Sequence, residues 1–363
     1  MSKRPRVWAI GPFPPPVTGI TLFTQEVIRQ LEKTGSVTFW NCSHGCQHVT
    51  IRARAKRVLR TLGCAFKLLW NGRVRDGRLY LSANSQGGLL ITWIVVLVGR
   101  AMGHRIYLHH HTYGHIQRHS LPMAWIDRSM GSCGTHVVHC DQMIDDFQRQ
   151  YHSTCGFETI FPSAESINVG QPRPAAHTPF RLGMLSNLTM DKGVDLAIAT
   201  FRALREKNRD VTLDLAGPVR SRAVGRLLEQ AQATYPGAVR HLGPLYDDAK
   251  TRFFEKIDAL LFPTRYESWG LVLHEAFAAG APVITFDRGC TNTLVGDRAG
   301  LVVPRDGDYI TLAVNQIERW MDSSIDYGAA SQAAVEQANY LQQQGRIQLE
   351  QFAQRMFVPH CKG

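Results

Sequence analysis

Several features that would assign this 363-residue sequence to a special class of protein are absent from it. Its longest strongly apolar run, Leu89–Val98, has ten residues, whereas about 20 are needed to span a bilayer. The first sixteen residues hold only a short apolar stretch before three successive prolines, so we expect no signal peptide. These absences favour a cytoplasmic protein without a transmembrane helix.

Cysteine pairs of the CxxC type are also missing, since the eight cysteines are scattered along the chain. A metal site formed by Cys42, His44, Cys46 and His48 is conceivable, but their spacing fits no common zinc pattern. We therefore expect reduced thiols, as in an ordinary cytosolic protein.

Positive charge, by contrast, is abundant: the sequence has 41 Lys and Arg but only 30 Asp and Glu, which gives a formal net charge of +11. Residues 1–170 carry +10 of this charge and residues 171–363 only +1. Such an excess predicts an anionic partner, which could be nucleic acid, a phosphorylated substrate or an acidic membrane surface. The sequence contains no recognisable nucleic-acid-binding motif, so we expect no nucleic acid.

Short β-type runs alternate with segments of helical period in both halves of the chain, and a polar, proline-rich stretch at 166–180 separates them. This alternation predicts an α/β fold of two Rossmann-like, doubly wound domains that face a central cleft. The N-terminal domain would span 1–168 and take back a C-terminal helix at about 344–363, and the C-terminal domain would span 169–343. Strands are expected at 6–11, 37–41, 79–82, 106–109, 136–140, 181–186, 212–216, 239–242, 259–262, 283–286 and 301–303.

The most specific segment follows the strand expected at 259–262. A loop there carries Glu267, Gly270 precedes a short helix, and Glu275 lies in the second turn of that helix. A helix N-terminus suits a phosphate, and glycine lets the backbone approach it closely. Alternatively, Glu267 caps the helix and Glu275 lies on a solvated face. The first interpretation predicts a pyrophosphate over Ser268, Trp269, Gly270 and Leu271.

This segment resembles the signature of retaining glycosyltransferases of family 4, which have the GT-B fold and two glutamates separated by seven residues. Farther upstream, Gly183–Asn187 and Asp191–Gly193 look like the family's strand, loop and helix with a phosphate-binding lysine, and Pro14–Ile20 resembles its glycine-rich loop. The resemblance extends along most of the chain. The sequence departs from it at Asn187, where many members have arginine, and at Thr18, where many have a first glycine.

The resemblance implies roles for individual residues. Glu275 would hold the ribose hydroxyls of a nucleotide, Glu267 would touch the donor sugar, and Lys192 would neutralise the leaving diphosphate. Arg265 could replace the missing arginine, or it could be an ordinary loop residue. The other donor contacts would come from Thr18, Gly19, Asn187, Ser268, Trp269, Gly270 and Leu271. The family implies no metal and no other cofactor.

Three successive histidines, His109–His111, follow the strand expected at 106–109. Side chains alternate along a strand, so His109 and His111 would share one face and His110 would lie on the other. The resemblance suggests that one of them reaches the donor sugar, with His111 favoured and His109 second. A metal site and a merely polar strand end are the alternatives, and no neighbouring carboxylate supports the metal.

A basic amphipathic helix is expected at 51–70, where apolar residues recur at helical spacing. This pattern predicts contact with an anionic membrane surface. The alternative is a solvated helix whose apolar face is core. The basic residues assigned to the membrane or the acceptor are Arg52, Arg54, Lys56, Arg57 and Arg60.

We therefore expect a retaining glycosyltransferase that uses a UDP-, GDP- or ADP-sugar. Its acceptor would be an oligosaccharide or a lipid-linked saccharide in the synthesis of cell-envelope material or exopolysaccharide, and the enzyme would lie on the inner face of the plasma membrane. The alternative is a non-catalytic, degenerate GT-B protein that binds nucleotides, which the departure at Asn187 favours.

Overall fold

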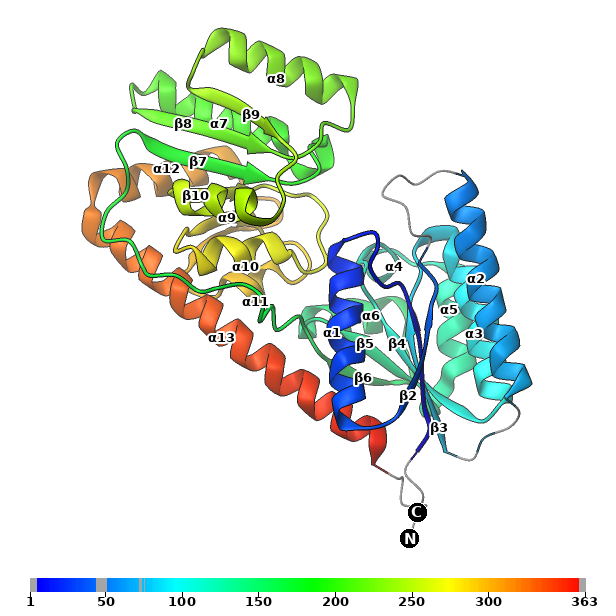
Figure 1. Cartoon of the computed structure of the whole chain (residues 1–363). Coiled ribbons are helices and arrows are strands. Elements are labelled where there is room, and N and C mark those ends of the chain that lie inside the picture. The colour runs from blue at the N-terminus through cyan, green and yellow to red at the C-terminus, as the bar shows by residue number, and fades with distance from the viewer. Residues whose placement is uncertain (1–4, 44–50, 72–73, 75, 359–363) are drawn as a thin grey trace. The chain divides into compact units, whose positions relative to one another are not determined.

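The computed structural model of the chain describes residues 5–43, 51–71, 74 and 76–358, without the side chains of 51–54. The chain divides into two compact units (Figure 1). Unit 1 comprises Met1–Ser163 together with Gln344–Gly363, and unit 2 comprises Ala164–Gln343.

Unit 1 is built on a six-stranded parallel sheet of order β2-β1-β3-β4-β5-β6. Its strands are β1 (Val7–Gly11), β2 (Val37–Asn41), β3 (Gly77–Ser82), β4 (His104–His109), β5 (Thr135–Val138) and β6 (Gly156–Thr159). Its helices are α1 (Gly19–Thr34), α2 (Ile51–Trp70), α3 (Leu89–Ala101), α4 (Gly114–Gln117), α5 (Leu121–Met130) and α6 (Asp141–Tyr151). The central strands β1 and β3 are buried throughout, as expected of a parallel sheet covered on both faces.

Two helical layers cover the sheet of unit 1. Helices α2, α3 and α5 lie side by side and form one layer (Figure 1). Helix α1 and the last part of α13 (Ser324–Phe357) pack against the other face, where Phe23 and Phe352 belong to the same buried cluster as Tyr80 and Tyr107 of β3 and β4. The C-terminal segment is therefore part of the unit 1 core.

Unit 2 repeats the architecture, with strand order β12-β11-β10-β7-β8-β9 and parallel pairing. Its strands are β7 (Phe180–Leu185), β8 (Val211–Ala216), β9 (Val239–Gly243), β10 (Ala259–Phe262), β11 (Val283–Phe286) and β12 (Gly300–Val303). Its helices, besides the first part of α13, are α7 (Val194–Glu206), α8 (Arg222–Thr234), α9 (Asp247–Lys256), α10 (Leu271–Ala278), α11 (Thr291–Val295) and α12 (Tyr309–Asp322). A 3-10 turn, η3 (Met190–Lys192), precedes α7.

All eleven strands expected from the sequence are present, with ends that differ by at most two residues. Strand β6 was not expected from the sequence; it lies at the edge of its sheet and is only partly buried. An edge strand of this kind has a neighbour on one side only, so it needs no strongly apolar run to form. Helix α5 and the short helices α4 and α11 were also not expected.

Candidate functional site

The centre of the candidate site in unit 2 is an ion pair between Lys192 and Glu267. The Lys192 Nζ atom donates to Glu267 Oε2 at 2.9 Å, and the other oxygen of Glu267 accepts from the Ser268 N–H at 3.0 Å. Both side chains are half-buried. They come from the loops that follow β7 and β10, which are neighbours in the sheet. The topology thus brings together two charged groups separated by 75 residues.

Gly193 allows these two loops to meet. Its φ is 79°, in the left-handed region, and a Cβ atom on it would lie 2.2 Å from the Pro263 carbonyl oxygen. Any other residue would push the loop of Lys192 away from the loop of Glu267. Backbone geometry therefore explains the glycine of the Asp-Lys-Gly sequence.

The N-terminus of α10 lies next to this ion pair in the chain. Gly270 is its N-cap residue, with φ 91°, and no side chain caps the helix. The alternative in which Glu267 caps α10 is wrong, because this carboxylate bonds to Lys192 and to the Ser268 N–H. The positive end of the helix dipole thus lies three residues after Glu267, the partner of Lys192, and this arrangement suits a diphosphate.

Glu275, in the second turn of α10, is held by a partner that the sequence analysis did not identify. Lys250 of α9 donates to Glu275 Oε1 at 2.5 Å. The Oε2 atom is buried and has no hydrogen-bond partner among the described residues. Burial raises the pKa of this carboxyl above its ordinary value, and the Lys250 charge partly offsets the rise. The alternative of a solvated Glu275 is therefore wrong, and Oε2 can accept from a ligand hydroxyl.

Asn187, which stands where many members of the family have arginine, contacts an arginine that was not expected from the sequence. Arg220, four residues after β8, donates from Nε to Asn187 Oδ1 at 3.1 Å, and both residues are exposed. Arg265, the candidate replacement, is instead bound to Asp195 at 2.8 and 3.1 Å and to the Met190 carbonyl. Arg220 is thus a cation in direct contact with position 187, and Arg265 stabilises the loop.

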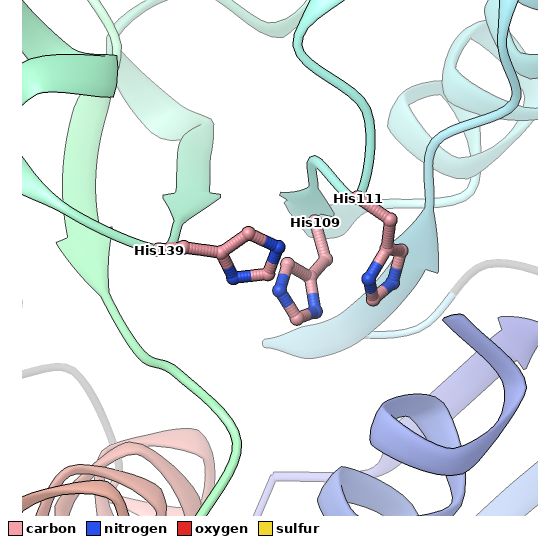
Figure 2. Close-up of side chains that lie close together, drawn as sticks. All are labelled: His109, His111 and His139. Carbon is pink, nitrogen blue, oxygen red and sulfur yellow. The ribbon is translucent and has the colours of Figure 1, made fainter. Parts of the chain in front are cut away.

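In unit 1, His109 and His111 are joined by a third histidine, His139, which follows the neighbouring strand β5 (Figure 2). All three are buried, and the ring centroid of His109 lies 4.0 Å from that of His111 and 5.2 Å from that of His139. Burial, with the neighbouring histidines, lowers the pKa of His109 and His111 well below the ordinary value. Burial also lowers the pKa of His139, to about 4. At neutral pH the three rings are therefore uncharged.

His110 lies on the opposite face of the strand end, as the alternation predicted. Its Nδ1 and Nε2 atoms lie 2.8 Å from His115 Nε2 and His136 Nδ1, respectively. His136 in turn lies 2.9 Å from Asp127 Oδ1. Both ring nitrogens of His110 are thus engaged in a buried network inside unit 1.

The loop after β1 ends at the N-terminus of α1, beside the three histidines. Thr18 caps this helix through reciprocal hydrogen bonds with Thr21, and Gly19 is its first residue. One turn later, the Phe23 ring lies 5.0 Å from the ring of His109, centroid to centroid. Thr18, Gly19 and His109 therefore share one edge of the unit 1 sheet, while the other predicted donor contacts lie in unit 2.

Helix α2 forms over the expected range, but most of its large apolar side chains are exposed to solvent rather than buried as in a core helix. Leu59, Phe66 and Trp70 are 70%, 62% and 82% exposed, whereas Cys64 and Leu68 face the core. The alternative in which the apolar face is core is therefore wrong for most of this face. Among the basic residues, Lys56 and Arg60 are exposed and Arg57 is half-buried. The Arg52 and Arg54 side chains lie outside the described part of the chain.

The cysteines and the apolar helices bear on two further predictions, reduced thiols and the absence of a membrane span. Cys42, Cys64, Cys133 and Cys155 are free thiols, as expected. Cys140 and Cys290 are disulfide-bonded, so the expectation of reduced thiols is wrong for these two residues. His44, Cys46 and His48 of the conceivable metal cluster lie outside the described residues. Among the described helices, none combines the length and the apolar character that a membrane span requires.

Comparison with known proteins places this chain among glycosyltransferase folds. Residues 179–321 match the family model described as glycosyl transferases group 1. Glycogen synthase of Mycobacterium tuberculosis is 31% identical over 142 residues, which cover 38% of this chain and 34% of that protein. Glycogen synthase of Marinomonas sp. is 33% identical over 116 residues, which cover 32% of this chain and 24% of that protein. The matches thus span about a third or less of the length of these curated relatives.

Solved structures match nearly the whole chain at low sequence identity. Sucrose-phosphate synthase from Thermosynechococcus elongatus has a TM-score of 0.69 at 15% identity and covers 97% of this chain and 98% of its own. HepE from Anabaena, in complex with UDP-glucose, has a TM-score of 0.68 at 13% identity. The match covers 96% of this chain and 98% of the HepE chain. The predicted fold class, two Rossmann-like α/β domains of the GT-B type, is confirmed.

Proposed function

We propose that this protein is a retaining glycosyltransferase of the family 4 type that transfers a sugar from a nucleotide diphosphate sugar. The observation that carries the proposal is the contact between Lys192 and Glu267 beside the uncapped N-terminus of α10. It lies inside the 179–321 segment that matches glycosyl transferases group 1. The structures of HepE with UDP-glucose and of TarM from S. aureus with UDP support a nucleotide-sugar donor.

In this proposal the positive charge of the protein stabilises the departing diphosphate. Lys192 would exchange Glu267 for a phosphate oxygen, and the first-turn N–H groups of α10 would bind another. Glu267, released from the lysine, would accept from a hydroxyl of the donor sugar. These groups supply the charge stabilisation without a metal or other cofactor. Retention would follow if the leaving diphosphate helped to deprotonate the acceptor on the face from which it departs.

The remaining donor contacts follow from the same geometry. Glu275 Oε2, buried without a partner among the described residues, would accept from the ribose hydroxyls. Arg220, bound to Asn187, would supply the cation that the chain lacks at position 187. The proposed sugar contact in unit 1 is His111, with His109 behind it. Unit 1 would also bind the acceptor.

A second part of the proposal is that one surface of unit 1 contacts a membrane. We call this surface, formed by the helices α2, α3 and α5, the α2–α3–α5 face. Five large apolar side chains of α2 are exposed, and α3 and α5 add further ones in the same helical layer. The exposed basic residues Lys56, Arg60 and Lys67 lie on α2 as well. This combination suits the interface of an anionic bilayer and supports a lipid-linked saccharide as acceptor. The apolar residues of this face are Leu59, Leu62, Phe66, Leu69, Trp70, Leu90, Ile94, Leu97, Leu121 and Trp125.

Replacing Phe66 and Trp70 together with serine is expected to weaken binding to anionic liposomes. Burying one large apolar side chain contributes about 1.5–3 kcal/mol, so the double variant should lose about 100-fold or more in affinity. Co-sedimentation with phosphatidylglycerol vesicles at low and high salt would measure it. Ile325→Ser, which changes an 83% exposed side chain of unit 2, is the matched control. Equal binding of the wild type and the double variant would contradict the membrane proposal.

A panel of UDP-, GDP- and ADP-sugars tests the enzymatic proposal and identifies the donor. The correct nucleotide sugar should raise the melting temperature in proportion to the logarithm of its concentration above Kd. Slow hydrolysis of that donor without acceptor would indicate a working enzyme. Stabilisation by a nucleotide sugar, with neither hydrolysis nor transfer to any acceptor, would instead establish a non-catalytic binding protein.

A further inference from the structure

We propose that His109, His111 and His139 form a binding site for one divalent transition-metal ion, with Zn²⁺ as the representative ion. The site lies inside unit 1, at the carboxyl ends of β4 and β5 (Figure 2). It shares His111 and His109 with the proposed sugar contact, so an ion bound there would occupy ring nitrogens that could otherwise face the sugar. The positive charge proposed for the transfer chemistry comes instead from Lys192 and α10 in unit 2.

The arrangement of the three imidazoles is the first argument. Each residue offers one ring nitrogen, and these nitrogens all lie within 4.8 Å of one another. In a tetrahedral zinc site with Zn–N distances of about 2.0–2.1 Å, the ligand nitrogens are roughly 3.3 Å apart. Small side-chain rotations would close the difference. His109 and His111 come from the same face of one strand end, and His139 comes from the end of the adjacent strand.

The hydrogen bonds on the outer nitrogens are the second argument. His139 Nδ1 lies 3.2 Å from the Ile160 carbonyl oxygen, which can only accept, so Nδ1 carries the proton and Nε2 is left with its lone pair. His109 Nδ1 lies 2.6 Å from Tyr80 Oη. Metal-binding histidines are usually oriented in this way, by a hydrogen bond from the nitrogen that does not bind the ion.

A buried atom without a partner is the third argument. His109 Nε2 has no hydrogen-bond partner within the described part of the chain, although its residue is 0% exposed. Leaving such an atom unsatisfied in the interior is unfavourable. A metal ion on Nε2 would account for it, because the nitrogen is oriented by Tyr80 through the other side of the ring.

A second group of potential ligands in the described residues, Asp127, His136 and Cys155, lacks this property. His136 Nε2 bonds to Asp127 Oδ1 at 2.9 Å, and the Cys155 thiol donates to the Gly131 carbonyl at 3.1 Å. The atoms that could bind a metal there are engaged with protein groups. We therefore assign the ion to the three histidines alone.

Three imidazoles leave a fourth coordination position for water or an anion.

Metal binding to the full-length, untagged protein, stripped with a chelator and then desalted, tests the assignment directly. Titration calorimetry with Zn²⁺ should show one ion per chain with micromolar or tighter affinity. Co²⁺ should give the visible absorption of a tetrahedral site. His139→Ala and His109→Ala should each lose at least 100-fold in affinity, whereas His241→Ala, which alters a unit 2 histidine bonded to the Gly217 carbonyl, should bind like the wild type.

Tyr80→Phe keeps the ring and removes only the hydroxyl that orients His109, so it serves if the alanine variants do not fold. It should weaken metal binding about 10- to 100-fold, the usual effect of losing such a partner. The proposal is overturned if the wild type binds no Zn²⁺ at 100 times the protein concentration. It is equally overturned if the folded histidine variants, or Tyr80→Phe when they do not fold, bind as the wild type does.

Discussion

Replacing Lys192 with alanine is expected to lower kcat for sugar transfer by about 10²- to 10³-fold, the usual cost of removing one group that stabilises developing negative charge. In the ligand-free protein the lysine is bound to Glu267, so its ammonium is already held beside the uncapped end of α10 when a diphosphate arrives. Initial rates at saturating donor would measure the loss.

The control for this prediction is Lys207→Ala. Lys207 is an exposed lysine of the same unit, and its ion pair with Glu318 lies on the surface. Its loss should change kcat less than twofold. A Lys192→Ala variant that folds normally and retains wild-type kcat would show that the proposed diphosphate site is wrong.

The Glu275→Gln variant is expected to bind the nucleotide about 10- to 100-fold more weakly, because hydrogen bonds to a charged group contribute about 1.5–3 kcal/mol. The same change should raise the melting temperature of the ligand-free protein at neutral pH. Burial raises the pKa of Glu275, so folding favours the protonated form, and ionisation above that pKa reduces stability. Glutamine is neutral and avoids this cost.

Calorimetric titration with the nucleotide and thermal unfolding between pH 4 and pH 8 would measure both effects. The stability gain of Glu275→Gln should grow as pH rises through the carboxyl pKa and vanish at lower pH. Glu336→Gln, on the surface of α13, should change neither quantity. Weaker nucleotide binding together with lower stability would indicate a structural role for Glu275, and unchanged binding would refute the ribose contact.

Much of the fold could be predicted from the sequence because apolar periodicity is a local property. The strands at 37–41, 259–262 and 283–286 and the helix at 51–70 have the expected bounds. The edge strand β6 could not be found in this way, since its four residues are held by pairing with β5 rather than by burial.

The residues of the candidate site could likewise be predicted only in part. The glutamate segment, the lysine and the strand-end histidines could be identified from residue type and spacing. Their partners could not, because Lys250, Arg220, His139 and Tyr80 carry no motif and become neighbours only when the parallel strands align. For Glu275, only the structure identified Lys250 as its partner.

Three features of this protein could be predicted from residues close together in the chain: two α/β domains, a segment rich in phosphate-binding features and a basic amphipathic helix. Three others became apparent only in the folded chain: the exposed face of α2, the bonding of Arg265 to Asp195 while Arg220 reaches Asn187, and the cluster that His139 forms with His109 and His111. The physical reason is that register and strand order, which bring distant side chains within hydrogen-bonding distance, are set by packing over the whole sheet.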